Sequence, residues 1–488
     1  MRTQYRLGAI PTRRWRKART QILIVLGAVA GLAMLGLLVT RSVWLLLTVV
    51  LAGLAAFWAF NRQDAVGDRW LTSIVGEGVR RVLARAGRWD EIDPDHERRP
   101  WALERYRVNE IDLAMGPLAL VDNGRGIVAV LQVDGGGDGI RDDLAHSRRE
   151  SALVGAIDAL AAPSSGVSQV DLVTNVRPAN ADAHAAWLKD AQEELRLTEV
   201  SPEAELGSAE LLEAVTGTAS YRSWAVVHMD VERLSRKARE HGLRPDGDVI
   251  LEVAAGVVGS VARILEDHGV PVLGALGSAQ LAAVVRSILD PHRSPDDLAG
   301  TDEFWDAWPG FQPTPLGDAT LTFGEDRQVR WYHAAAGIHR ESYPADPVVG
   351  RWLDPILLEA GSIPNRTITV QYGLVSHREA REIARERATI EEAKLVRQTK
   401  RGVVSDGDLE ERAGQAGGMT RDITLRGHAG VIVGVHVHVA AERAQVLRRL
   451  RETADATVEQ RMGAELTWHD GRQPQGLLRS LPIGLPVH

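Results

Sequence analysis

The distribution of apolar and polar positions separates an apolar N-terminal stretch from a longer part in which strand and helix patterns alternate. In the first stretch, two runs of 18 residues, 22–39 and 43–60, contain no charged side chain, and Thr40, Arg41 and Ser42 lie between them. A helix of that length measures about 27 Å, close to the roughly 30 Å of a bilayer core. These runs predict a transmembrane helical hairpin over residues 21–60.

Three other interpretations of the apolar stretch are weaker. One continuous helix would bury Arg41 near the bilayer centre at a cost of about 3 kcal/mol or more, whereas a turn at residues 40–42 leaves it at the interface. A cleaved signal peptide would need a small-x-small cleavage site between the two runs, and the sequence has none. A buried hairpin in the core of a soluble protein is the remaining alternative.

The charges that flank the hairpin predict its orientation. Residues 1–20 carry seven arginines and lysines and no acidic residue, and arginines follow the second run as well. Since basic flanks stay in the cytoplasm, we expect both ends of the chain there. In the stretch 61–100, apolar residues at helical spacing with arginines opposite predict an amphipathic helix, followed by a polar linker. That helix would lie on the anionic inner leaflet or pack on the rest of the protein.

From residue 101 onwards, strand and helix patterns follow one another twice in the same order. The first pass opens with a hairpin around Asn123-Gly124, the dipeptide most typical of tight hairpin turns. Its further elements are a helix at about 142–161, a strand at 169–176, a helical excursion at 181–215, a strand at 223–231, a long helix at about 249–267 and a short strand at 270–276. We assign residues 101–290 to a first cytoplasmic α/β unit.

The second pass repeats this order after a linker at 291–314 that is rich in Pro, Asp and Gly. Its elements are two strands within 319–338, a helix at about 347–359, a strand at 366–375, a charged excursion from 378 to about 414, a strand at 430–440, a helix at 442–458 and a strand at 464–470. We assign residues 315–488 to a second unit with a charged helical arm at 376–415. Acids and arginines three and four residues apart are typical of a solvated helix. The arm is therefore either merely solvated or a docking surface.

The predicted fold class is α/β (α+β): a transmembrane helical hairpin followed by two tandem α/β units with mixed sheets. Helices must pack on these sheets, because a sheet with an uncovered apolar face is not stable by itself. The repeated order of elements indicates a degenerate duplication, although repeated order is weaker evidence than repeated residues.

Composition and charge narrow the function. The net charge of −8 argues against a protein that coats nucleic acid, and we expect no direct sequence-specific binding to it. The chain has no cysteine, which excludes disulfides, thiolate metal sites and cysteine nucleophiles. No lysine follows a glycine, so the phosphate-binding loop G-x-x-x-x-G-K-[ST] is absent.

Two candidate sites remain, and both have a structural explanation. The loop Asp134–Gly139 resembles a phosphate- or calcium-binding loop, but its two acids would repel phosphate and the EF-hand spacing is missing. His436 and His438 point to the same face of one strand, with His428 upstream; a metal site would need a third ligand, which the sequence does not place. His228 is typical of a half-buried histidine. We therefore predict no catalytic, cofactor or metal site and no enzyme.

Several segments resemble a family of actinobacterial membrane proteins encoded in conjugative-transfer loci. They are "HGVPVLGALGSAQLAAVVRSILDP" at 268–291, "RWLDPILLEAGSIPNRTITVQYGLVSHREAREIARER" at 351–387 and "LLRSLPIG" at 477–484. The basic start and the two adjacent apolar runs fit that family as well. Its soluble part is in turn similar to the N-terminal, non-ATPase half of the conjugation ATPases of type IV secretion.

The resemblance implies a non-catalytic structural subunit in the plasma membrane that recruits or positions a separate ATPase beside other channel subunits. A homo-oligomer is expected, because channels are built as symmetric rings. An EccE-like component of type VII secretion also has two N-terminal membrane helices and a cytoplasmic α/β domain, and it is the first alternative. The second, from a different class, is a membrane-tethered metal-binding enzyme or sensor that uses the histidines and the glycine loop.

Overall fold

The computed structural model describes residues 4–5, 106–122, 126–134, 143–179, 219–298, 304–308, 311–314, 316–323, 328–339, 343, 348–349, 352–358, 360–400, 414, 417–418 and 430–483. The transmembrane hairpin expected at 21–60, the link expected at 61–100 and the helical excursion expected at 181–215 lie outside these residues. None of the helices in the described part is both long and apolar enough to cross a bilayer.

The described part of the first unit contains the predicted strands and the helices predicted at 142–161 and 249–267 in the predicted order, together with elements that the sequence patterns did not indicate. The new ones are the strand β2, the helices α7 and α9 and the short helix η2. The elements are β2 (Arg107–Leu113), β3 (Gly116–Asp122), β4 (Gly126–Val133), α4 (Asp143–Leu160), η2 (Pro163–Ser165), β5 (Val167–Pro178), β6 (Ala219–Asp230), α7 (Val231–Glu240), α8 (Gly247–Asp267), β7 (Val272–Ala275) and α9 (Ser278–Leu289). Asp230 and Asp246 begin α7 and α8 as N-caps, each accepting backbone N–H groups of the first turn.

The second unit also follows the predicted order and adds a final helix. The described elements from residue 304 on, with the N-terminal strand β1 (Gln4–Tyr5), are η3 (Phe304–Ala307), β8 (Phe311–Pro313), β9 (Thr320–Phe323), β10 (Val329–Ile338), β11 (Val348–Val349), α10 (Asp354–Leu357), β12 (Arg366–Val375), α11 (His377–Lys400), β13 (Gly430–Ala441), α13 (Ala444–Thr457), the π turn η4 (Val458–Met462), β14 (Leu466–Trp468) and α14 (Gln473–Ser480). The helix expected at 347–359 is wrong in its first half, where β11 pairs with β1. Pro355 lies in the first turn of α10, where a proline begins a helix and cannot continue one.

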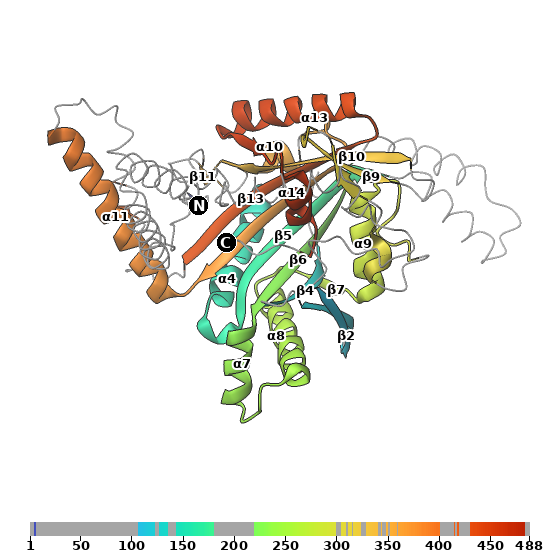
Figure 1. Cartoon of the computed structure of the whole chain (residues 1–488). Coiled ribbons are helices and arrows are strands. Elements are labelled where there is room, and N and C mark those ends of the chain that lie inside the picture. The colour runs from blue at the N-terminus through green and yellow to red at the C-terminus, as the bar shows by residue number, and fades with distance from the viewer. Residues whose placement is uncertain are drawn as a thin grey trace, which may run out of the picture.

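Apart from β1 and β11, the described strands form one sheet (Figure 1). Its order is β2-β3-β4-β6-β5-β12-β13-β10-β9-β8, with β7 paired to β4 and β14 to β10. The expectation of mixed sheets is wrong for the described strands, because every pair is antiparallel. The crossover through α4 leaves a gap between the parallel strands β4 and β5. The antiparallel strand β6 fills this gap, as in a split β-α-β unit.

The strand order is symmetric about the pairing of β5 with β12. We call this pairing the seam. The run β3-β4-β6-β5 corresponds to β9-β10-β13-β12, and β7 on β4 corresponds to β14 on β10. Each half is thus a β-α-β-β-α-β unit of ferredoxin-like topology. Across the seam, pairing runs from Arg366 opposite Val176 to Gly373 opposite Gln169. The two units therefore share one continuous sheet.

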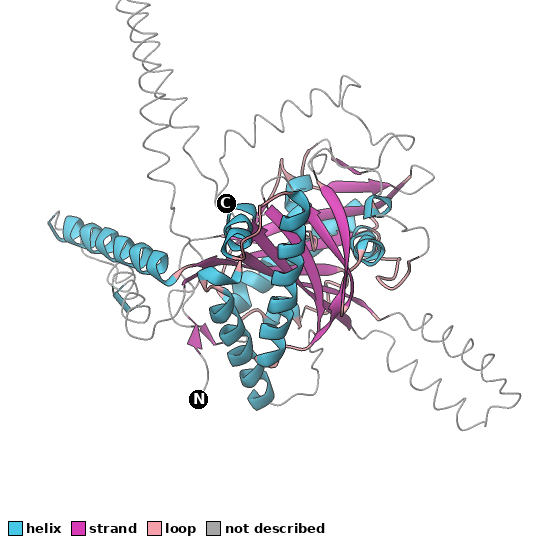
Figure 2. Ribbon diagram, turned by 90° about the horizontal axis from the view of Figure 1, so that it is seen from below, coloured by secondary structure: helices cyan, strands magenta, loops and turns pink. Residues whose placement is uncertain are grey.

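Helices cover both faces of this sheet (Figures 1 and 2). On one face, α4 and α8 enclose the core of the first unit, and α10 and α13 enclose that of the second. These cores share a face, because Leu172 of the first lies directly opposite Val370 of the second across the seam. The other face packs against α9 and α14.

The described parts of the segment expected as a linker at 291–314 pack on the body of the protein. Phe304 and Trp308 are each 1% exposed and belong to the core beneath α9, and their rings contact each other edge to face. Strand β8 extends the sheet by pairing with β9. The apolar pattern of this segment is sparse, but its two large aromatic side chains anchor it.

Helix α11 is the charged arm, and it projects from the body (Figures 1 and 2). Only its first turns pack on the sheet: Ala380 and Ala384 are buried against Val375. A Cβ at Gly430, at the start of β13, would overlap the Cβ of Ala380. The glycine therefore lets the arm approach the sheet closely at its root.

Candidate functional site

Polar and ionisable side chains line one face of the central strands, beneath α9 and α14. All of them are buried, and we call this set the polar stripe. Its members are His228 on β6, Gln169, Asp171 and Asn175 on β5, Thr367, Thr369 and Gln371 on β12, His436 and His438 on β13, His333 on β10, and Thr320 and Thr322 on β9. The stripe crosses the seam, so both units contribute to it.

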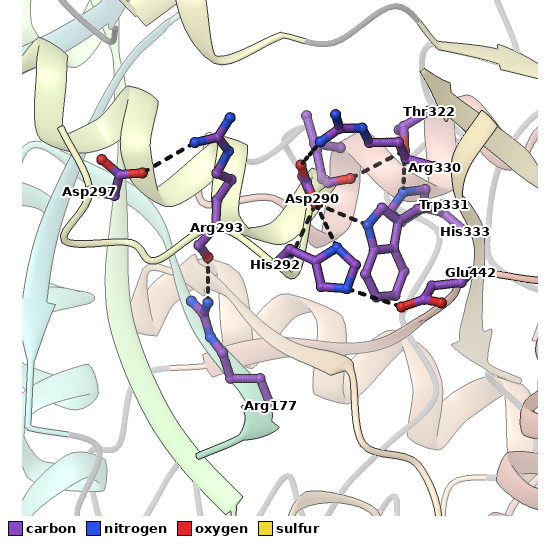
Figure 3. A network of polar contacts seen from close by, with 11 residues as sticks. Arg177, Asp290, His292, Arg293, Asp297, Thr322, Arg330, Trp331, His333 and Glu442 are labelled. Carbon is purple, nitrogen blue, oxygen red and sulfur yellow. Dashed lines mark hydrogen bonds and ion pairs between the residues drawn. The ribbon is translucent and has the colours of Figure 1, made fainter. Parts of the chain in front are cut away.

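A chain of hydrogen bonds links five strands within this stripe. Thr322 Oγ1 donates to the Leu289 carbonyl at 3.3 Å, so the Nε2–H of His333 must donate to Thr322 Oγ1 at 3.1 Å (Figure 3). His333 Nδ1 is then an acceptor for the Nε2–H of His438, at 3.0 Å. Beyond it, His438 Nδ1 accepts from Thr367 Oγ1 at 3.4 Å.

The chain ends on β5, where Asn175 Nδ2 donates to Thr367 Oγ1 at 3.0 Å. Each group in the chain therefore donates a hydrogen bond to the next, from Asn175 to the Leu289 carbonyl. This direction requires that both histidines of the chain are neutral. Burial lowers the pKa of His438 to about 3, and burial followed by the neighbouring His438 ring lowers the pKa of His333 well below its ordinary value. Because an amide and a carbonyl terminate this chain, it orients side chains and does not deliver protons to a reacting group.

A second polar group surrounds a carboxylate that is completely buried. Asp171 accepts from Gln169 Nε2 at 2.6 Å, from His228 Nε2 at 2.8 Å and from Gln371 Nε2 at 3.4 Å. Within the second unit, the Gln371 amide oxygen accepts the Nε2–H of His436 on β13 at 3.0 Å. Three donors from both units thus compensate the desolvation of the Asp171 carboxylate.

The expectation that His436 and His438 share one face is confirmed, since both are buried in the polar stripe. Both ring nitrogens of His438 already take part in hydrogen bonds, so it has no lone pair for a metal ion without breaking the chain. Within the described ranges, no three His, Asp or Glu residues form a group that could hold a metal. His428 and residues 135–139 of the glycine loop lie outside these ranges.

A small polar cavity lies where the chain reaches β5. Asn175, Arg177, Ser287, Thr367 and His438 are among the residues that line it. Its volume of about 10 Å³ is at the lower limit for one water molecule, which needs roughly 10–15 Å³. Beside the cavity, Arg177 NH1 donates to the Arg293 carbonyl at 2.7 Å. Burial is the main cause that lowers the pKa of Arg177 to about 10, and repulsion from the charge of Arg222 is the second.

At the surface, a charged network surrounds the end of α9 (Figure 3). Asp290 accepts from Trp331 Nε1 at 3.0 Å and lies 3.4 Å from Arg330 NH1. His292 stacks edge to face on Trp331 and pairs with Glu442 through Nε2 at 3.0 Å. Because Leu289 precedes Asp290, this network joins the buried chain at Thr322.

An open groove of about 320 Å³ lies over this network, lined by His292, Val329, Arg330, Glu442 and Arg443. This size is at the lower end of small-molecule sites. His292 and Glu442 have side chains 64% and 57% exposed, so their pairing is screened by water. The groove is a mixed-charge surface in which His292 already pairs with Glu442, and Arg330 with Asp290.

The sequence patterns missed most of the polar stripe. His333 lies in "WYHAAAGI" and Asp171 in "QVDLVTNV", both within runs that predict buried strands. A polar residue at an inward position of such a run is the signal that could have found them, because buried polar groups need partners. Their hydrogen-bond partners could not be predicted from the sequence, because the seam joins residues about 200 positions apart, such as Asp171 and Gln371.

A scan of the chain against protein-family models found no match, and a search of curated proteins found none either.

Proposed function

We propose that this protein is a non-catalytic structural subunit of a conjugative, type IV-like transfer machine in the plasma membrane, where it positions a separate ATPase. The observation that carries the proposal is the arm α11, a helix of 24 residues that projects from a rigid antiparallel body. Long charged helices on a stable scaffold suit the docking of a partner. In this proposal the histidines of the stripe hold the scaffold together and bind no substrate.

The arm offers both an anchor and a free surface. Its root is fixed by Ala380 and Ala384, while Ile390 and Val396 further along are 46% and 47% exposed. Both apolar side chains lie among charged residues, as is typical of an interface core with a polar rim. We propose that this part of the arm contacts the ATPase.

The pairing of β1 with β11 supports the expected orientation in the membrane. Gln4 pairs with Val349 and Tyr5 with Val348, so residues 4–5 lie against the second unit. This position fits a membrane segment at 21–60 that crosses an even number of times, as the proposed helical hairpin would. With seven basic residues in positions 1–20, we propose that both the N-terminus and the two units are cytoplasmic.

The mirrored strand order supports the further proposal that the two units arose by duplication. Two ferredoxin-like units joined edge to edge bury the edge strands β5 and β12 against each other. We propose that several copies of the chain then assemble into a ring around the transfer channel.

Single cysteines test the orientation cleanly, because the chain has no cysteine of its own. Thr12→Cys, Ser42→Cys and Leu316→Cys are placed in turn in the full chain and exposed to a membrane-impermeant maleimide. We expect labelling of Ser42→Cys in intact cells, and of the other two only after permeabilisation. Labelling of Leu316→Cys in intact cells would refute a cytoplasmic scaffold. The unmodified chain is the blank.

Affinity purification from membranes tests the partner. We expect an ATPase to co-purify with the full chain, and the double variant Ile390→Glu/Val396→Glu to retain less than a tenth of it. Leu273→Glu, at a body position 62% exposed, is the matched control and should retain the partner. Equal recovery with both variants would reject the arm as the docking site. A type VII secretion ATPase in the eluate would favour the EccE-like alternative.

A further inference from the structure

The last described elements of the chain cover the histidines of the second unit. After β14 the chain turns at His469, and α14 then lies across strands β8–β10, β12 and β13. Both backbone groups of Ala335 hold this segment: its carbonyl accepts the His469 N–H at 2.9 Å, and its N–H donates to Gln473 Oε1 at 2.7 Å. We call residues 469–481 the latch.

The latch fits closely because of one glycine. A Cβ at Gly476 would lie 2.6 Å from His469 Cδ2 and 3.0 Å from the Cβ of Ala335. Real side chains do not tolerate such an approach to a ring packed on both sides. The closed position of α14 therefore depends on the missing side chain at residue 476.

Three histidines, two on strands that α14 crosses and one within the latch, are buried and neutral. His333 and His438 are locked in the one-way hydrogen-bond chain, and His469 is 2% exposed and stacks on His436 with ring centroids 5.9 Å apart. His469 Nε2 has no hydrogen-bond partner among the described residues. An unpaired buried nitrogen is costly, so His469 weakens the closed position of the latch.

We propose that the latch is an acid-released cover, which lifts from the sheet when His333, His438 and His469 take up protons from water. A protonated imidazole has two donors and no acceptor. Protonated His333 could then no longer accept the hydrogen bond from His438, and protonated His438 could no longer accept the one from Thr367. The protons must leave before the latch can close again.

The sign of the pH effect follows from the two states. In the closed state burial lowers the pKa of His438 to about 3, and the pKa values of His333 and His469 lie well below the ordinary value. In the open state, exposed histidines titrate near 6.5. Below that pH the open state binds protons that the closed state does not, so each of these histidines favours opening by about tenfold per pH unit. Above pH 6.5 the closed state of the latch is fully favoured.

Other charged groups around the latch modify this response. Arg479 of α14 and Arg472, which precedes α14, repel a proton on His469 and so favour release once that ring is charged. On α13, Arg451 pairs with Asp470 at 2.9 Å, and Asp455 accepts from Trp468 Nε1, which keeps β14 in place. The remaining facing groups are Arg286 and Asp290 at the end of α9, His436 on β13, and Asp171 with His228 further along the stripe. We therefore place the hinge after Asp470: residues 471–481 lift, and His469 at the base of the latch is uncovered when Gly476 moves away from its ring.

Hydrogen–deuterium exchange on the full-length protein tests the proposal at pH 7.5, 6.5 and 5.5, corrected for intrinsic rates. We expect the protection of amides 473–481 to fall more than tenfold per pH unit below 6.5, while α8 and β6 change far less. His469→Gln should reduce this dependence by about tenfold per unit. The exposed His241→Gln should leave it unchanged.

A glycine variant supplies a second measurement that does not depend on a histidine change. Gly476→Ala should open the latch at pH 7.5, with protection of 473–481 at least tenfold lower than in the unmodified chain. Gly256→Ala, in α8 where a Cβ meets nothing within 4 Å, is the matched control and should retain protection. Protection of α14 that is independent of pH, or lost only together with that of α8, would overturn the proposal.

Discussion

At the residue scale, this protein places its polar groups where a sheet normally carries apolar ones. Most members of the stripe hydrogen-bond one another across neighbouring strands, which offsets the cost of their burial, whereas the hydroxyls of Thr320 and Thr369 have no partner among the described residues. The directional chain through His438 and His333 also fixes both tautomers. A single substitution within it therefore changes several hydrogen bonds at once.

The buried histidines should make the protein sensitive to acid. Between pH 6.5 and about 3, His438 binds a proton in the unfolded chain but not in the folded one, so unfolding becomes easier as the pH falls. The free energy of unfolding should drop by about 1.4 kcal/mol per pH unit from this residue alone. Urea unfolding from pH 7.5 to 4.5 measures it, and His438→Gln should flatten the slope. A constant free energy over this range would contradict a neutral buried His438.

Arg366 is the second residue whose role only its surroundings reveal. It is 2% exposed, and its guanidinium donates to the carbonyls of Ile356, Leu357, Ala360 and Ile363 around α10, while burial lowers its pKa. We expect Arg366→Leu to destabilise the fold by about 3–5 kcal/mol, because it strands several buried carbonyls. Chemical denaturation measures this, with the exposed Arg448→Leu as control. A loss as small as that of the control would show that these carbonyls find other partners.

At the element scale, local patterns found most of the longer strands and helices, but they missed strand β2, the short strands β8 and β11 and several helices. Strand β12 matches its prediction at both ends, and α4 and α8 differ by one or two residues. Helix α14 was missed because "QPQGLLRS" is short and contains Pro and Gly, which argue against a helix. It forms because Leu477 and Leu478 fill a core that the sheet creates.

The root of the arm depends on Gly430. We expect Gly430→Ala to force Ala380 away from β13, to destabilise the protein by about 1–3 kcal/mol and to lower the protection of the first turns of α11. Thermal unfolding and hydrogen exchange measure both effects. Gly259→Ala on α8, where a Cβ meets nothing within 4 Å, should stabilise by about 0.5–1 kcal/mol instead. Unchanged protection of the arm would mean that it is held elsewhere.

At the scale of the whole molecule, the seam makes two similar units into one body. The backbone pairing from residue 366 to 373 and the contacts of Asp171 with Gln371 both cross it. A unit without its neighbour would expose the edge of a central strand and half of a polar network. Exposed edges of this kind pair with other chains.

A fragment of residues 304–488 should therefore not exist as a folded monomer. We expect it to dimerise through β12 or to aggregate, and to return to a 1:1 complex when it is co-expressed with residues 101–298. Light scattering after size-exclusion chromatography distinguishes these states. A soluble monomer with native protection in β12 would show that the seam is not needed for folding. Co-expression with an unrelated soluble protein is the control.

The sequence by itself determined most of the elements and their order, because periods of two and of 3.6 residues are written into neighbouring positions. It also indicated that His436 and His438 share a face. The transmembrane hairpin and the transfer function remain predictions from residues 21–60 and from resemblance.

Tertiary structure alone decided the rest. The sheet is wholly antiparallel in its described pairs because β6 and β13 enter gaps that the crossovers leave, and a local pattern does not contain that choice. The seam, the partners of Asp171 and the closeness of Gly476 to His469 join residues that are distant in sequence or separated by a turn. Such contacts depend on how whole elements pack, and the alternation of polar and apolar residues along one strand does not specify its neighbour.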